Sequence, residues 1–163
     1  MSKWIDLYEE FINVSKTLNQ QLAIVPVLYG SLGLEKVTQV DFSPQDIDIL
    51  VPLAFLEEKW ELLKDTMEQL NYTLVDVNEH EFIKNESKIG FAFIEDLVEF
   101  ADVDYKSLKV FEESGAKYYL LTISDYLKVY TKSLQDGYRR TKNNNKDLHK
   151  LEILNRLLHD QTR

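Results

Sequence analysis

Two short apolar segments joined by a polar connection constrain the fold of this chain more than any other feature. The first spans residues 24–28, and the second, residues 46–51, has the pattern of a buried strand that carries two carboxylates. Successive side chains of a strand point to opposite faces, so Asp46 and Asp48 are predicted to share one face of a sheet. Two carboxylates this close repel each other unless a cation or a proton lies between them. The segment therefore predicts a cation site.

The composition excludes several classes of protein. With 163 residues, of which 44% are hydrophobic, the chain is long enough for one domain with an ordinary core. It contains neither an apolar run of about 18–20 residues nor a start typical of a signal peptide, so we expect a cytoplasmic protein without membrane contact. The absence of cysteine excludes disulfides and thiol chemistry. A net charge of −9 makes extended nucleic acid an unfavourable partner.

Apolar periodicity predicts an α+β fold, a mixed β-sheet packed by helices with a helical pair at the C-terminal end. Residues 1–122 are expected to form the core and residues 123–163 a helical extension packed on it, as one compact domain. The predicted helices are 3–18, 54–70, 124–137 and 145–160, and the predicted strands are 24–28, 46–51, 72–77, 81–84, 88–94, 109–111 and 117–121. In the last helix Leu148, Leu151, Leu154 and Leu158 are expected to form the buried seam.

Gly30 and Ser31 close the first strand and are the second half of the candidate site. A glycine at a strand end lets a ligand approach the backbone closely, and a helical turn after it would offer free N–H groups to an anion. The Ser31 hydroxyl can add a hydrogen bond to a phosphate. Since Mg²⁺ prefers carboxylate and phosphate oxygens, Asp46 and Asp48 beside this corner predict a site for Mg²⁺, with one or two ions, and a nucleoside triphosphate.

The stretch resembles the signature of the polymerase-beta-like nucleotidyltransferase superfamily, in particular its small minimal and antibiotic-type members. That signature is an apolar strand ending in Gly-Ser, a connection, and then Asp-apolar-Asp-apolar. It stands here as Leu28-Tyr29-Gly30-Ser31 followed by Asp46-Ile47-Asp48-Ile49. The resemblance implies that Asp46 and Asp48 are the catalytic, metal-binding residues and that Gly30 and Ser31 bind the β- and γ-phosphates.

The end of the chain resembles the tail of the same small nucleotidyltransferases, in which a helix with a lysine precedes a Lys-Asp pair. Lys128 or Lys132 matches that lysine, and Lys146-Asp147 matches the pair. The segment 139–150 is also basic in an otherwise acidic chain. The predicted clamp for the triphosphate consists of Lys128, Lys132, Arg139, Arg140 and Lys146.

One part of the family pattern has no clear counterpart. Members usually carry a third carboxylate on a later strand, and by position the segment 88–94 corresponds to it. That segment contains no acidic residue, and Glu95 and Asp96 at its end are the candidates for a further metal ligand.

Three functions remain open from the sequence. The first is Mg²⁺-dependent transfer of a nucleoside monophosphate from an NTP to a hydroxyl of a small molecule or a protein. The second is a catalytically silent protein of the same fold that binds a nucleotide or another protein, for example in a toxin–antitoxin-like pair. The third is an α+β interaction module in which the motif is fortuitous.

Overall fold

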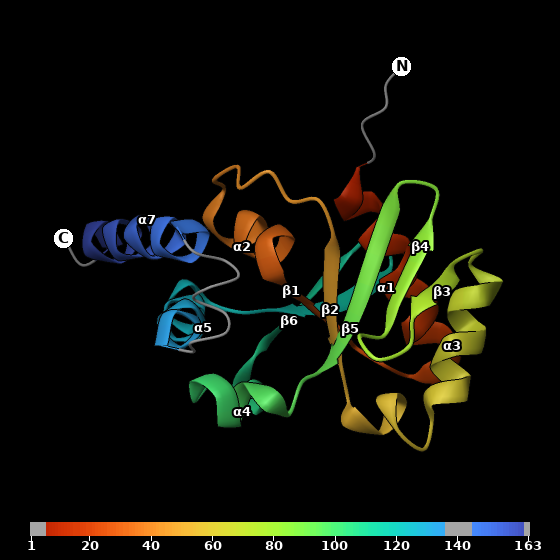
Figure 1. Cartoon of the computed structure of the whole chain (residues 1–163). Coiled ribbons are helices and arrows are strands. Elements are labelled where there is room, and N and C mark those ends of the chain that lie inside the picture. Colours follow the sequence, from red (N-terminus) through yellow and green to blue (C-terminus); the bar gives the residue numbers. More distant parts are fainter. Residues whose placement is uncertain (1–5, 136–144, 162–163) are drawn as a thin grey trace.

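A computed structural model of the chain describes residues 6–135 and 145–161, and within them seven strands form one mixed sheet (Figure 1). The strand order is β3-β4-β5-β2-β1-β7-β6, with β2 parallel to β5 and β1 parallel to β7. The strands are β1 (Val27–Tyr29), β2 (Ile47–Val51), β3 (Thr73–Asp76), β4 (Glu81–Lys84), β5 (Ser87–Phe93), β6 (Lys109–Glu113) and β7 (Ala116–Leu120). The predicted α+β fold, a mixed sheet packed by helices, is confirmed.

The helices lie on both sides of this sheet (Figure 1). They are α1 (Leu7–Leu22), α2 (Gly30–Thr38), α3 (Trp60–Gln69), α4 (Asp96–Ala101), α5 (Ile123–Gln135) and α7 (Asn145–Gln161), with 3₁₀ turns η1 (Leu53–Leu56) and η2 (Tyr105–Ser107). In the part of the chain that the structure describes, no helix combines the length and the apolar character needed to cross a membrane.

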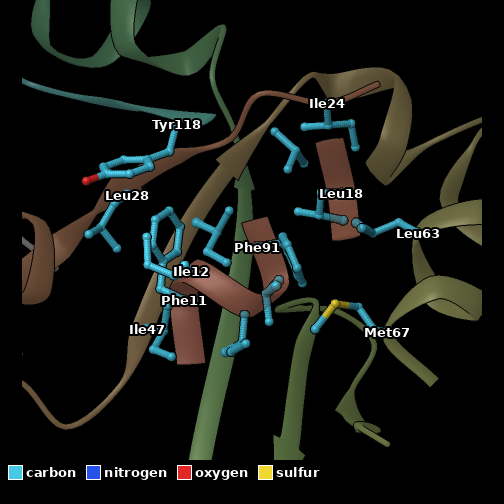
Figure 2. Packing of buried hydrophobic residues seen from close by; sticks show 14 of the residues in the cluster. Phe11, Ile12, Leu18, Ile24, Leu28, Ile47, Leu63, Met67, Phe91 and Tyr118 are labelled. Carbon is cyan, nitrogen blue, oxygen red and sulfur yellow. The ribbon is translucent and has the colours of Figure 1, made fainter. Parts of the chain in front are cut away.

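One core lies between the sheet and helices α1 and α3 (Figure 2). Phe11 and Leu18 of α1 and Leu63 and Met67 of α3 are fully buried there. Phe11, an aromatic residue on the apolar face of the helix predicted over 3–18, is therefore a packing residue. Its ring contacts Tyr118 of β7 edge to face, with the ring centroids 5.3 Å apart.

A second core lies on the other face, where α5 and α7 pack together against the sheet. Tyr126 and Val129 of α5 meet Leu151 and Leu154 of α7 in this core. The predicted C-terminal helical pair is present, but the prediction that Leu148 belongs to the buried seam of its second helix is wrong. Leu148 is 46% exposed, because α7 buries the face that carries Leu151 and Leu154.

The turn segments 85–87 and 112–115 predict two β-hairpins, and both are present, with turns of two residues that set the register of the sheet. Asn85-Glu86 joins β4 to β5, so Lys84 pairs with Ser87 and the register continues to the neighbouring strands. At the other edge Ser114-Gly115 joins β6 to β7, with positive φ at both residues, as in a type I′ turn.

Two predicted elements differ from the structure. The polar connection after Gly30 contains α2, whose Leu32 and Leu34 are buried, because its few apolar residues dock against the sheet although its other positions are polar. The single helix predicted over 54–70 is divided into η1 and α3. The backbone of Glu57 leaves the helical region there, with φ −123° and ψ −105°.

Gly33, on the inner side of α2, provides a test of this packing. A Cβ atom at residue 33 would overlap the backbone carbonyl of Leu28 and the hydroxyl of Tyr126. We expect Gly33→Ala to lower the free energy of unfolding by about 2–3 kcal/mol, because a backbone carbonyl cannot move aside. Urea unfolding measures this value. Gly90→Ala is the control, since a Cβ at residue 90 finds its nearest neighbours at 3.7 Å, and equal stability of the two variants would contradict the expectation.

Candidate functional site

The site begins where β1 passes directly into α2 at Gly30. The backbone of Gly30 has φ +66°, a conformation that side chains rarely adopt. A Cβ atom there would also overlap the carboxylate of Asp48. Glycine at residue 30 therefore allows the chain to turn into α2 and leaves space for the Asp48 carboxylate at the first turn of that helix. The N-terminus of a helix carries a partial positive charge that favours such an anion.

Asp48 projects from β2 toward this corner, with Tyr29 and Gly90 as its neighbours in register on the two adjacent strands. Its side chain reaches the solvent, yet the protein atoms around the carboxyl group displace enough water to raise its pKa to about 6. The negative charges of Asp46 and Glu81 raise the pKa further, while Lys150 and Lys88 lower it. The carboxylates outnumber the nearby lysines, so a further cation would stabilise the ionised form of Asp48.

Two adjacent hollows meet at Asp48. The first hollow has a volume of about 350 Å³ and the second hollow about 540 Å³. Asp48, Ser31 and Lys150 line both, so these three side chains form the wall between them. The first hollow is also lined by Tyr29, Gly30, Glu79, Glu81, Gly90 and Tyr130, and the second hollow by Asp41, Phe42, Ser43, Gln45, Asp46 and His149.

Lys150 of α7 is the cation of this wall. Its Nζ atom donates a hydrogen bond to the Ser31 hydroxyl at 3.1 Å and lies 4.9 Å from the centre of the Tyr130 ring. Tyr130 stacks on Tyr126, and Tyr126 stacks on Tyr29, with ring centroids 6.0 and 6.2 Å apart. This column of three tyrosines ties α5 to the end of β1. It supports Lys150 beside the Gly-Ser corner.

Glu81 of β4 enters the first hollow from the strand beyond Gly90. Gly90 pairs with Asp48 on one side and with Glu81 on the other. Glu81 forms an ion pair with Lys88, with Nζ and Oε1 3.3 Å apart. Three carboxylates, those of Asp46, Asp48 and Glu81, therefore lie around the same end of β2.

Two residues of the predicted triphosphate clamp, Lys128 and Lys132, lie away from this site. Lys128 and Lys132 line a separate hollow between α4 and α5, where Lys128 Nζ donates to the carbonyl oxygen of Asp102 at 3.1 Å. Arg139 and Arg140 lie outside the described residues, and Lys146 belongs to the first turn of α7.

Glu95 and Asp96, the candidate metal ligands beyond β5, are also placed elsewhere. The Glu95 carboxylate accepts a hydrogen bond from the backbone N–H of Leu53 at 3.0 Å, just after the last residue of β2. Asp96 is the first residue of α4. Gly90 is the residue of β5 that pairs with Asp48, and β5 ends at Phe93, about 10 Å farther along the strand. Glu95 and Asp96 follow that end, so neither residue reaches Asp48.

Sequence reasoning missed Lys150 and Glu81, although each left a signal. Lys150 precedes Leu154 by four residues, so both lie on the same face of α7, and the burial of Leu154 brings Lys150 toward the core. Glu81 can be located by counting back from the two-residue turn Asn85-Glu86, which sets it opposite Gly90.

Asp46 and Asp48 fit a magnesium ion by the chemistry of their donor atoms. Among residues 6–135 and 145–161, no three histidine, aspartate or glutamate side chains are already grouped closely enough to hold a metal. Magnesium, however, is usually bound through one or two carboxylates, several waters and the phosphates of a substrate. Asp46 and Asp48 supply the two carboxylates, and Gly30 leaves the space that the Asp48 carboxylate requires.

Comparison with known proteins gives a relative that matches nearly the whole chain. No protein-family model matches the chain. Over 152 residues the chain is 64% identical to a protein of Bacillus subtilis (strain 168) called uncharacterized protein YnaI. The match covers 93% of this chain and 97% of the relative, so the two proteins are alike over nearly their whole length and not through one shared segment.

Proposed function

The chain belongs to the same protein family as YnaI of Bacillus subtilis, and we propose that it is a cytoplasmic nucleotidyltransferase of the polymerase-beta-like kind. A nucleoside triphosphate is the donor, and a hydroxyl of a small molecule or a protein is the acceptor. The acceptor oxygen attacks the α-phosphorus, the bond from that phosphorus to the bridging oxygen breaks, and pyrophosphate leaves. The proton of the hydroxyl passes to solvent.

One observation carries this proposal, the position of the Asp48 carboxylate against Gly30 in the wall between the two hollows. A transferase must hold two reactants on either side of the group that is transferred. Two hollows that share Asp48, Ser31 and Lys150 supply two such compartments. Positioning of the two reactants accounts for most of the protein's part in phosphoryl-type transfer.

The residues that line the two hollows have different roles in the proposed reaction. Lys150 and Ser31, already hydrogen-bonded to each other, are placed to bind phosphate oxygens next to the N-terminus of α2. Asp46 and Asp48 would hold Mg²⁺, which when bound neutralises phosphate charge and activates the attacking hydroxyl. Without that cation the carboxylates that line the two hollows would repel a triphosphate. Binding of the nucleotide is therefore expected to depend on magnesium.

A second candidate function is a silent member of the same fold that binds nucleotide or another protein without transfer. It is favoured by Gly90, which stands beside Asp48 where the sequence resemblance leads us to expect a carboxylate. If this candidate is correct, the protein either binds a nucleotide without forming a product or does not bind a nucleotide. Mass spectrometry after incubation with Mg²⁺ and each of the four NTPs distinguishes the two candidates. A nucleotidylated product, on the chain itself or on an added small-molecule acceptor, supports the transferase and excludes the silent protein.

Lys150→Met tests the proposed site by calorimetric titration of ATP, GTP, CTP and UTP in the presence of Mg²⁺. We expect the affinity for the preferred NTP to fall about tenfold or more, because a hydrogen bond to a charged group contributes about 1.5–3 kcal/mol. Lys128→Met is the matched control, since Lys128 Nζ bonds to a carbonyl in the hollow between α4 and α5. Equal losses in both variants, or no NTP binding by the unaltered chain, would contradict the proposal.

A further inference from the structure

Strand β6 forms one of the two edges of the sheet, and all five of its residues are exposed. The opposite edge strand, β3, has a register shift between Leu74 and Asp76, an irregularity of the kind that hinders pairing with another strand. By contrast, β6 pairs with β7 in an unbroken register over its whole length. A further strand can therefore extend the sheet at β6.

The backbone of β6 directs hydrogen-bonding groups to this open edge. On β7 the N–H of Tyr119 donates to the carbonyl oxygen of Pro26 at 2.8 Å, on the side away from β6. Val110 is the residue paired with Tyr119, so in an antiparallel ladder its own N–H and C=O groups point away from β7. The pattern repeats at every second residue, and the backbone of Glu112 therefore faces the open edge as well.

The middle of β6 offers an apolar contact. Phe111 is 41% exposed, although its ring stacks on that of Tyr118 in β7 with the ring centroids 6.1 Å apart. Phe111 also lines a hollow of about 410 Å³. The apolar residues that line this hollow with it are Val37, Leu120, Leu121, Ile123 and Leu158. An exposed apolar side chain at the centre of a regular edge strand favours contact with another chain.

The charges on β6 are complementary to those of a second copy of the same strand. Lys109, Phe111 and Glu113 alternate onto one face, with the ammonium group at one end and the carboxylate at the other. The Glu113 carboxylate is already oriented, because its Oε1 atom accepts a hydrogen bond from the Tyr8 hydroxyl at 2.8 Å. When two copies of β6 lie antiparallel about a two-fold axis through Phe111, each lysine is opposite the glutamate of the other copy.

The same register satisfies the backbone. It sets Val110 opposite Glu112 of the second copy, and these are the residues whose N–H and C=O groups face the edge. An axis through Glu112 would instead place two like charges opposite each other. An axis through Val110 would leave Lys109 without an opposite charge. The axis through Phe111 is therefore the one that pairs both the charges and the backbone groups.

We propose that the protein forms a homodimer in which β6 of one copy pairs antiparallel with β6 of the other, with the two-fold axis at Phe111. The two sheets then become one continuous sheet. The proposal is independent of the proposed function, because β1 and β7 separate β6 from β2 and the candidate site.

Sedimentation equilibrium of the full chain tests the dimer. We expect Lys109→Glu and Glu113→Lys each to raise the Kd of the dimer about tenfold or more, because each change turns two ion pairs into two like-charge contacts. Glu86→Lys is the control. It changes the charge of an exposed residue in the turn between β4 and β5, and it should leave the Kd unchanged.

An equal mixture of Lys109→Glu and Glu113→Lys tests the register. In the heterodimer each new side chain lies opposite one of opposite charge, so we expect the mixture to regain the Kd of the unaltered chain. Within one copy Lys109 and Glu113 are four residues apart along a strand, or about 13 Å, so a contact inside one chain cannot produce this rescue. Circular dichroism and thermal melting show whether each variant is folded.

Three results would overturn the proposal. The first is an unaltered chain that stays monomeric at every concentration up to about 200 μM, which would leave the edge to a different partner. The second is a dimer whose Kd neither single variant changes. The third is a loss of the dimer that mixing the two variants does not reverse. If Glu113→Lys fails to fold, Lys109→Glu decides alone, and an unchanged Kd overturns the proposal.

Discussion

Asp48→Asn is expected to abolish Mg²⁺-dependent nucleotide binding and, at neutral pH, to make the protein more stable. Binding is lost because the variant removes the carboxylate of Asp48, which lines both hollows and with Asp46 would hold the cation. Stability rises because the folded protein holds an ionised Asp48 close to other carboxylates and partly away from water. The gain is on the order of 1 kcal/mol once the solvent screening of this exposed side chain is taken into account. Functional sites commonly carry such a cost in stability.

The pH dependence of this gain has a definite sign. Folding raises the pKa of Asp48 from 3.8 to about 6, so the folded state binds the proton more tightly than the unfolded state. As the pH rises from about 4 to about 6 the unfolded state binds fewer protons, and the contribution of Asp48 to stability falls. Urea unfolding should therefore give equal free energies for the two proteins below pH 4 and the full difference above pH 6.

Asp65→Asn is the control for this measurement, because Asp65 is an exposed carboxylate on α3 for which no such gain is expected. Titration with Mg²⁺ and the preferred NTP follows binding in both variants. A variant Asp48→Asn that binds nucleotide as well as the unaltered chain, or that is less stable at pH 7.5, would contradict the description of the site.

Gly30→Ala is the second change with a large expected effect. Alanine at φ +66° costs about 1–2 kcal/mol. Its Cβ also overlaps the Asp48 carboxylate, which must move from the corner. We expect a total loss of about 2–4 kcal/mol in the free energy of unfolding, together with loss of Mg²⁺ binding.

Gly115→Ala is a matched control, because Gly115 has φ +84° but only the flexible end of Lys16 within 4 Å of its Cβ position. It should cost about 1 kcal/mol and leave Mg²⁺ binding intact. The double variant Gly30→Ala with Asp48→Ala removes the overlap, so the two changes should couple favourably by about 1 kcal/mol or more. Strict additivity would show that the carboxylate does not lie against Gly30.

Local patterns in the sequence were enough to locate most elements. Apolar runs bounded by turn residues predicted the strands, and the turn segments 85–87 and 112–115 predicted both hairpins, because a tight turn needs backbone conformations that few residue types favour. The connection after Gly30 was harder to interpret. Too few of its residues are apolar to show a helical period, and α2 is held by docking on the sheet.

The corner at Gly30 and the aspartates at and just before the start of β2, Asp48 and Asp46, were also found from the sequence alone. They are close in the chain, and alternation along a strand is a local rule that needs no knowledge of distant segments. A glycine and two carboxylates within 19 residues were therefore sufficient to predict a site for a phosphate and a cation, and that site stays a prediction. The resemblance to nucleotidyltransferases rests on the same local residues.

Only the tertiary structure decided which other side chains meet Asp48. Lys150 lies 119 residues from Ser31 and reaches it because α7 docks on α5 against the sheet, while Lys128 is carried to a different hollow by the rotation of α5. Glu81 lines the first hollow together with Asp48 because β4 pairs with β5 and β5 pairs with β2. Helix docking and strand order depend on the burial of whole faces, and such burial is a property of the assembled core and not of any local segment.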